Sequence, residues 1–167
     1  MRGQEVPLVR EAGAVFAVVQ KHAVAPIGID AGVAAHLLGE PGLLPASPAL
    51  LSSVGSPKLL IEVANTGVLH ALRPPLARIV EWGKDNGVNG CYVYCVVGKD
   101  EYEGRNFNHL DPAREDTATG VAAGALSAWL GRGIIMRQGA AMANPCRILT
   151  SVSGNDIYVG GATEALA

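Results

Sequence analysis

Residues 119–130 form an apolar stretch without a single charged side chain. A helix that is uncharged on every face must be buried on every face, so this stretch predicts a buried central helix. Acidic and hydroxyl side chains precede it directly, at Glu115, Asp116, Thr117 and Thr119. The pattern therefore places an acidic turn against the positive end of a helix, where free N–H groups can hold an anion.

Shorter apolar runs separated by turn-forming residues come before this helix. The β-rich runs at residues 6–9 and 14–20 flank a short turn, which predicts a hairpin. Asp30 is a predicted N-cap and Gly39 a predicted stop for a helix over residues 31–38. Each prediction rests on a local signal at the end of an element.

Proline, glycine and serine crowd residues 40–57, which predicts a surface loop. Residues 57–64 then predict a strand, and residues 68–72 are expected to extend it or pair with it. Two prolines at 74 and 75 open a predicted helix that ends at Asn86, before Gly87.

Further strands are predicted on both sides of the central helix. Residues 89–97 predict a buried strand and residues 103–108 another, while residues 147–152 and 156–159 predict a closing hairpin. Trp129, near the end of the central helix, is expected in the core, with a partner surface as the alternative.

Strands in pairs with three helices among them favour an α+β fold with a mixed, mostly antiparallel sheet. The 167 residues fit a single domain, which is expected to bury roughly 70% of its unfolded surface. The sequence contains neither a glycine-rich dinucleotide fingerprint nor a P-loop.

Composition narrows the class of protein further. Hydrophobic residues make up 49% and charged residues 17%, which disfavours disorder, and a net charge of −2 offers no electrostatic attraction for nucleic acid or an anionic membrane. Neither a membrane span nor a signal peptide stands out, so a soluble, cytoplasmic protein is expected. Because Met1 opens the chain, a complete reading frame is also expected.

The three cysteines predict buried, reduced thiols. Cys91 and Cys95 share one face of a predicted strand about 13 Å apart, which is too far for a disulfide. Cys146 is distant in sequence and no histidine stands in a ligand-like pattern, so a metal or redox centre is not expected.

Asp116 is the candidate for chemistry, because a carboxylate just ahead of a buried helix can transfer protons. Thr117 and Thr119 are expected to cap the helix, and the backbone N–H groups at Thr119 and Gly120 to bind a carboxylate. The alternative is an ordinary capping arrangement without a ligand.

The same region carries a family resemblance. Arg105-Asn-Phe107 is followed after seven residues by Glu115-Asp116-Thr-Ala-Thr119-Gly120-Val-Ala. This resembles the signature of the PhzF-like phenazine-biosynthesis isomerase family: R-x-F, seven variable residues, then E-D-P-A-T-G-S-A. Residues 53–60, 72–74 and 157–162 are similar to further segments of the family, in the same order.

The resemblance implies a fold like that of diaminopimelate epimerase, with two lobes that each wrap a mixed sheet around a central helix. The active site lies in the cleft between the lobes, and this chain resembles the C-terminal lobe only. The implied protein is an isomerase of a biosynthetic process that moves a proton on a small carboxylate substrate without a cofactor or metal. Asp116 is the implied catalytic residue; the implied substrate-binding residues are Glu115, Thr117, Thr119, Gly120, Val121, Phe107 and His109.

The chain departs from the family pattern in three respects. The N-terminal lobe, with its G-N-P motif, its general acid/base glutamate and its G-H-x-T turn, has no counterpart here. Val121 replaces the serine after T-G, so a substrate-binding hydroxyl is lost. Thr117 and His109 stand where the family has proline, and Pro112 where it has glycine; His109 is a candidate titratable group near Asp116.

Two hypotheses follow. In the first, a homodimer completes the cleft, because one lobe alone cannot form it and two-fold interfaces are the commonest kind. The two Asp116 carboxylates would then lie close together and divide the acid and base roles. In the second, the chain is a non-catalytic lobe that binds a small molecule or assembles with itself.

Overall fold

The computed structural model describes residues 6–20, 29–108 and 115–162. Four α-helices lie in these residues: α1 (Ala31–Leu38), α2 (Thr66–Ala71), α3 (Leu76–Asn86) and α4 (Gly120–Leu130). The strands are β1 (Leu8–Glu11), β2 (Ala14–Gln20), β3 (Leu50–Ser52), β4 (Lys58–Glu62), β5 (Cys91–Gly98), β6 (Glu101–Phe107), β7 (Ile135–Gln138), β8 (Cys146–Ser153) and β9 (Asp156–Ala162). A 3₁₀-helix, η1 (Ala140–Met142), follows β7.

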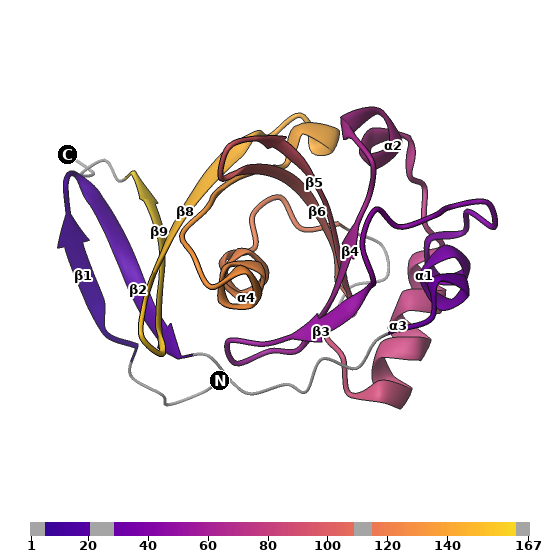
Figure 1. Ribbon diagram of the computed structural model, residues 1–167, viewed down its shortest axis with the longest axis horizontal. Coiled ribbons are helices and arrows are strands. Elements are labelled where there is room, and N and C mark those ends of the chain that lie inside the picture. The colour runs from indigo at the N-terminus through magenta and orange to yellow at the C-terminus, as the bar shows by residue number, and fades with distance from the viewer. Residues whose placement is uncertain (1–5, 21–28, 109–114, 163–167) are drawn as a thin grey trace.

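The described strands join one sheet in the order β1-β2-β9-β8-β7-β6-β5-β4-β3. β4 pairs with β5 and β6 with β7 in parallel, whereas the other neighbours are antiparallel. The mixed sheet expected from the sequence is therefore confirmed. The sheet is strongly curved, and α4 lies on its concave side (Figure 1).

The curved sheet separates two apolar cores. The inner core joins α4 to the concave face and contains Leu60, Tyr92, Ala122, Ala123, Leu126 and Met136. The outer core lies under α1, α2 and α3 and contains Leu37, Leu59, Ile61, Leu69, Ile79 and Val93. Alternate residues of β4 and β5 enter opposite cores, as the two-residue period of a strand requires.

Local signals account for the elements that were predicted correctly. The Asp30 carboxylate accepts a hydrogen bond from the Gly32 N–H (2.7 Å), and Gly39 ends α1 in the left-handed conformation. β1 and β2 form the predicted hairpin, as do β8 and β9. α3 ends at Asn86, as expected, with Gly87 as its C-cap.

Four sequence-based expectations were wrong or incomplete. Residues 68–72, expected as strand, lie mostly in α2, because Asn65 caps a helix by accepting the Val68 N–H (3.0 Å). β3 lies within the predicted loop, and β7 was not predicted. Trp129 is 46% exposed and does not fill the core.

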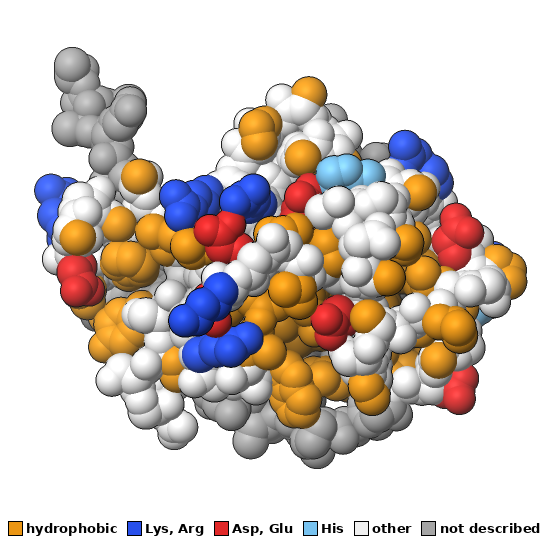
Figure 2. All heavy atoms as spheres, turned by 45° about the horizontal axis from the view of Figure 1, so that its top comes forward, with side chains coloured by type: hydrophobic (Ala, Val, Ile, Leu, Met, Phe, Trp, Pro, Cys, Tyr) orange, Lys and Arg blue, Asp and Glu red, His pale blue; other side chains and the backbone are white. Residues whose placement is uncertain are grey.

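Exposed charges pair across the face seen in Figure 2, where blue and red side chains lie next to one another. Arg132 contacts Asp100 (3.3 Å), and Arg137 pairs with Glu101 across neighbouring strands. No helix in the described part of the chain is long and apolar enough to span a membrane.

Candidate functional site

Asp116 lies in the turn that leads into α4, and the turn is tied to the end of β6. The Asp116 N–H donates to the Asn106 carbonyl (3.1 Å), which forms an isolated β-bridge between the two residues. This backbone contact brings a carboxylate that follows the strand in sequence back to the side chains of the strand itself.

One oxygen of the Asp116 carboxylate is held by three donors. Oδ2 accepts hydrogen bonds from the Asn106 amide (2.7 Å), the Asn108 amide (3.1 Å) and the Thr119 hydroxyl (3.2 Å). Oδ1 makes no hydrogen bond with any residue in the described ranges. Asp116 is half-buried, and among the described residues its carboxylate is oriented through Oδ2 alone.

Gln138, at the end of β7, supports the same turn from behind. Its amide donates to the Asp116 carbonyl (2.9 Å) and to the Thr119 hydroxyl (3.1 Å), while its own oxygen accepts from the buried Tyr92 hydroxyl (3.0 Å). The Cys146 thiol donates to the Thr117 carbonyl (3.2 Å). Strands β5, β7 and β8 therefore fix the backbone of the turn.

Glu115 is engaged by Arg105 in a buried, bidentate ion pair. Arg105 Nε and Nη2 donate to the two carboxylate oxygens at 2.9 and 2.7 Å, and the side chains are 8% and 11% exposed. Arg105 Nη1 also donates to the carbonyls of Leu69 and Leu72, both at 2.9 Å. The guanidinium thus joins the end of α2 to the start of the turn.

The remaining predicted site residues have different surroundings. Phe107 is 1% exposed and lies under the Arg105 guanidinium, whose Cζ is 4.8 Å from the ring centre. Thr117, Gly120 and Val121 are half-buried beside Asp116 in the chain. His109 lies outside the described residues. Substrate binding by these residues stays a prediction.

Thr119 does not cap α4 with its side chain, contrary to expectation. Its hydroxyl donates to Asp116 Oδ2 and accepts from the Gln138 amide instead of from a helix N–H. Within the described residues, the N–H groups of Gly120 and Val121 have no hydrogen-bond acceptor. The positive end of α4, next to the Asp116 turn, therefore keeps two N–H groups without an acceptor in the part of the chain that the structure describes.

Lys58, a buried cation whose charge acts on Asp116, was not predicted from the sequence. Lys58 is 2% exposed, and its ammonium donates to the Asn89 carbonyl. Burial lowers its pKa to about 8, and the negative charge of Asp116 opposes that shift. Asn106, which is fully buried, keeps its side-chain oxygen without a hydrogen bond.

The available sequence signal for these residues was weak. Lys58 and Asn106 occupy strand positions in phase with the inner core residues Leu60 and Tyr102. A polar residue at a core-facing strand position indicates a buried polar cluster. Only the folded sheet shows that Lys58 and Asn106 belong to the same cluster.

Comparison with known proteins decides the family. The family model of the phenazine biosynthesis-like proteins (PhzC-PhzF) matches residues 18–163. The chain belongs to this family. The resemblance found in the Arg105 to Ala122 segment is therefore confirmed.

Members of the phenazine biosynthesis-like family with curated names match about half of the chain. An uncharacterized isomerase from Deinococcus radiodurans is 35% identical over 83 residues, which cover 50% of this chain and 27% of that protein. An uncharacterized isomerase from Salmonella typhimurium is 33% identical over 94 residues, which cover 56% and 32%. This chain therefore matches only part of each relative.

Solved structures support the PhzF-like fold. A predicted epimerase from Pseudomonas aeruginosa has a TM-score of 0.71 and 26% identity, with 96% of this chain and 60% of that chain covered. A PhzF-family protein from Bacillus anthracis also has a TM-score of 0.71, with 19% identity and coverage of 94% and 61%. The chain thus spans less than two thirds of these structures.

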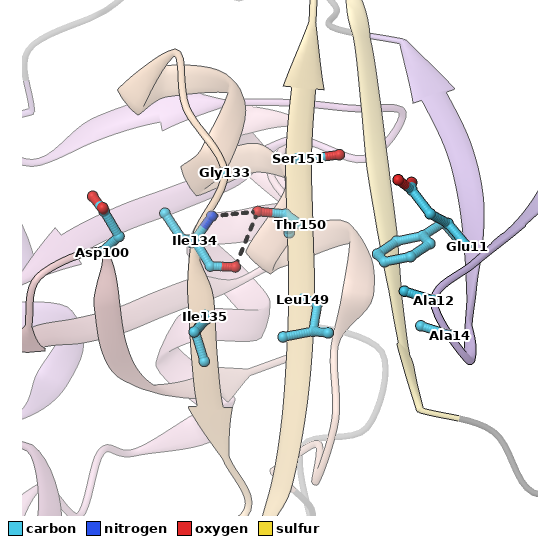
Figure 3. Close-up of a pocket in the computed structure, with 11 residues that line it drawn as sticks. Glu11, Ala12, Ala14, Asp100, Gly133, Ile134, Ile135, Leu149, Thr150 and Ser151 are labelled. Carbon is cyan, nitrogen blue, oxygen red and sulfur yellow. Dashed lines mark hydrogen bonds between the residues drawn. The ribbon is translucent and has the colours of Figure 1, made fainter.

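A cavity of about 480 Å³ lies elsewhere in this PhzF-family chain (Figure 3). Phe16, Ile135 and Leu149 supply apolar walls, while Glu11 and Asp100 supply carboxylates. None of the predicted site residues that the structure describes lines this cavity. The Asp116 turn and this cavity are therefore separate features.

Proposed function

We propose that the chain is one diaminopimelate-epimerase-like lobe of a PhzF-like isomerase, which moves a proton on a small carboxylate substrate without a cofactor. The arrangement of Asp116 supports this proposal most directly. One carboxylate oxygen is fixed by three donors while the other carries no hydrogen bond among the described residues, beside the open N–H groups of α4. Relatives of this family carry the name isomerase.

In this mechanism Asp116 Oδ1 takes a proton from the carbon next to the substrate carboxylate. The same group returns it to a different carbon, or an acid on the opposite wall delivers a proton to the other face. The electron pair of the broken C–H bond passes into the carboxylate group of the substrate. The N–H groups of Gly120 and Val121, at the positive end of α4, stabilise the charge that develops there. Arg105 and Gln138 hold the turn in place and do not touch the substrate.

We further propose that a homodimer completes the site. Asp116 and the open end of α4 form one wall, and the family pattern contains a second lobe that this chain does not match. A second copy related by a two-fold axis supplies an equivalent wall. Two Asp116 carboxylates in one cleft repel each other, so one holds a proton more firmly and serves as the acid.

We expect Asp116→Asn to lower proton exchange at least about 100-fold, because the amide cannot accept the proton. Deuterium incorporation from D₂O into a panel of small carboxylates, followed by mass spectrometry, measures this exchange. Asp85→Asn, on the exposed surface of α3, is the matched control and should exchange like the parent protein. If no panel member shows Asp116-dependent exchange, the non-catalytic lobe that binds small molecules or assembles with itself becomes the better account.

We expect light scattering to give a mass about twice the 17.2 kDa of one chain. In the dimer the two Asp116 carboxylates should lie within reach of one substrate. A monomer in solution, or a dimer whose Asp116 groups are more than about 15 Å apart, contradicts the shared cleft.

A further inference from the structure

The proposed site must hold two anions, the Asp116 carboxylate and a substrate carboxylate, which repel each other. The end of α4 supplies only about half a positive charge. Arg105 does not compensate for either anion, because its guanidinium is already paired with Glu115 and two carbonyls. A buried cation beside the turn would offset this repulsion.

The strand register places Lys58 toward this site. Leu59 pairs with Cys91, and Cys91 pairs with Phe107, across three neighbouring strands. Lys58, residue 90 and Asn108 therefore lie at the same end of these three strands, the last two just beyond the paired residues. Residue 90 is glycine and adds no side chain between Lys58 and Asn108, whose amide holds the Asp116 carboxylate.

Among the described residues, one anion acts on the Lys58 ammonium. Ser52, its register partner on β3, and Asn89, whose carbonyl accepts its hydrogen bond, are both neutral. Cys91 also acts on Lys58, but burial raises the pKa of this thiol to about 12, so it stays neutral near pH 7. Asp116 is therefore the negative charge that interacts with the Lys58 ammonium.

Within the described residues, Lys58 and Asn106 both keep hydrogen-bonding groups without a partner. The Lys58 ammonium has three N–H donors, of which one bonds to the Asn89 carbonyl. The Asn106 side-chain oxygen is a fully buried acceptor without a partner. A buried polar group left unpaired is costly, so these two groups favour the binding of a further polar partner.

We propose that Lys58 is a positioning residue of the Asp116 site: its buried ammonium is the countercharge that lets the Asp116 carboxylate and a carboxylate ligand occupy the site together. The ligand half of this inference rests on the proposed function, whereas the pairing of Lys58 with Asp116 does not. Carboxylate binding is then linked to the Lys58 proton, and the affinity falls as that proton is lost.

Lysine labelled with ¹³C at Cε reports the pairing directly by NMR, because the chain contains four lysines and Lys58→Arg identifies the Lys58 signal. We expect the Lys58 signal to titrate with a pKa of about 8. In Asp116→Asn the midpoint should fall by about one pH unit or more, since the loss of a nearby anion disfavours the ammonium. Asp85→Asn is the control and should leave the midpoint unchanged. If Asp116→Asn leaves the titration midpoint of the Lys58 signal unchanged, the inference is overturned.

Acetate serves as the probe for the ligand half, with the amide signals of Gly120 and Val121 as the readout. We expect the acetate affinity to fall several-fold between pH 7 and pH 9.5, and Lys58→Met to lower it about tenfold at pH 7. Lys58→Arg should restore most of the affinity, because it keeps the charge. Both variants must retain the parent amide spectrum away from the site.

The outcomes separate this inference from the proposed function. Equal acetate affinity in Lys58→Met and the parent protein overturns the inference alone. A Lys58 midpoint that responds to Asp116→Asn, with no acetate effect at α4, overturns the ligand half together with carboxylate binding in the proposed function. The Asp116→Asn titration uses native Lys58, so it holds even if Lys58→Met does not fold.

Discussion

Arg105→Met is expected to lower the free energy of unfolding by about 3–5 kcal/mol, because it leaves a buried carboxylate without its partner. Glu115 is 11% exposed and receives two hydrogen bonds from Arg105. The carbonyls of Leu69 and Leu72 lose their donor in the same variant. Equilibrium unfolding in urea at a fixed protein concentration measures the change.

Paired variants test whether the loss of unfolding free energy comes from the unpaired Glu115 carboxylate. Arg105→Met combined with Glu115→Leu removes both ions and should recover much of the stability. The free energy of unfolding of Arg105→Lys should lie between those of the parent and Arg105→Met, because an ammonium keeps the charge but cannot reproduce the bidentate contact. A loss below about 1 kcal/mol in Arg105→Met would show that the pair contributes little, as exposed pairs do.

Helix ends marked by local chemistry could be predicted from the sequence. Asp30 and Gly39 define α1, and Gly87 ends α3, because capping depends on residues adjacent in the chain. The hairpins β1–β2 and β8–β9 were predicted for the same reason. Their turns bring together strands that are already neighbours in sequence.

Elements that depend on partners distant in sequence could not be predicted. β3 is a three-residue strand within a loop-like composition, and it exists because β4 pairs with it. β7 is four residues long and pairs with β6 and β8. Residues 68–72 are as apolar as a strand, but the capping side chain of Asn65 starts a helix there. Trp129 is 46% exposed although α4 is uncharged, while Ala128 and Leu130 on either side of it pack against apolar clusters, so the absence of charge along the helix did not decide which way this side chain faces.

The candidate site also combines contacts that are local in sequence, which could be predicted, with distant ones, which could not. The acidic turn and the start of α4 are contiguous in sequence, so their proximity was predicted. Lys58, Asn106 and Gln138 come from β4, β6 and β7, and only the sheet register brings them behind the turn. The expectation that Thr119 caps α4 failed because Gln138 and Asp116 compete for its hydroxyl.

Gly139→Ala is expected to lower the free energy of unfolding by about 3 kcal/mol or more. Gly139 has a φ of +90°, and an added Cβ would lie 2.1 Å from the Asn144 oxygen and 2.8 Å from the Thr117 oxygen. Both are backbone atoms, so the β7–β8 connection or the Asp116 turn must move. Urea unfolding measures the loss.

Gly154→Ala is the matched control, because Gly154 has a φ of +60° but open space around the added Cβ. It carries the backbone strain without the clash, so we expect a loss of about 1 kcal/mol. Cys146 gives a second readout, since its thiol donates to the Thr117 carbonyl and the other two cysteines are buried. Gly139→Ala should speed the reaction of this thiol with a disulfide reagent, whereas Gly154→Ala should not. Equal stability and thiol reactivity in the two variants would mean that the Thr117 carbonyl does not depend on the close approach of Gly139.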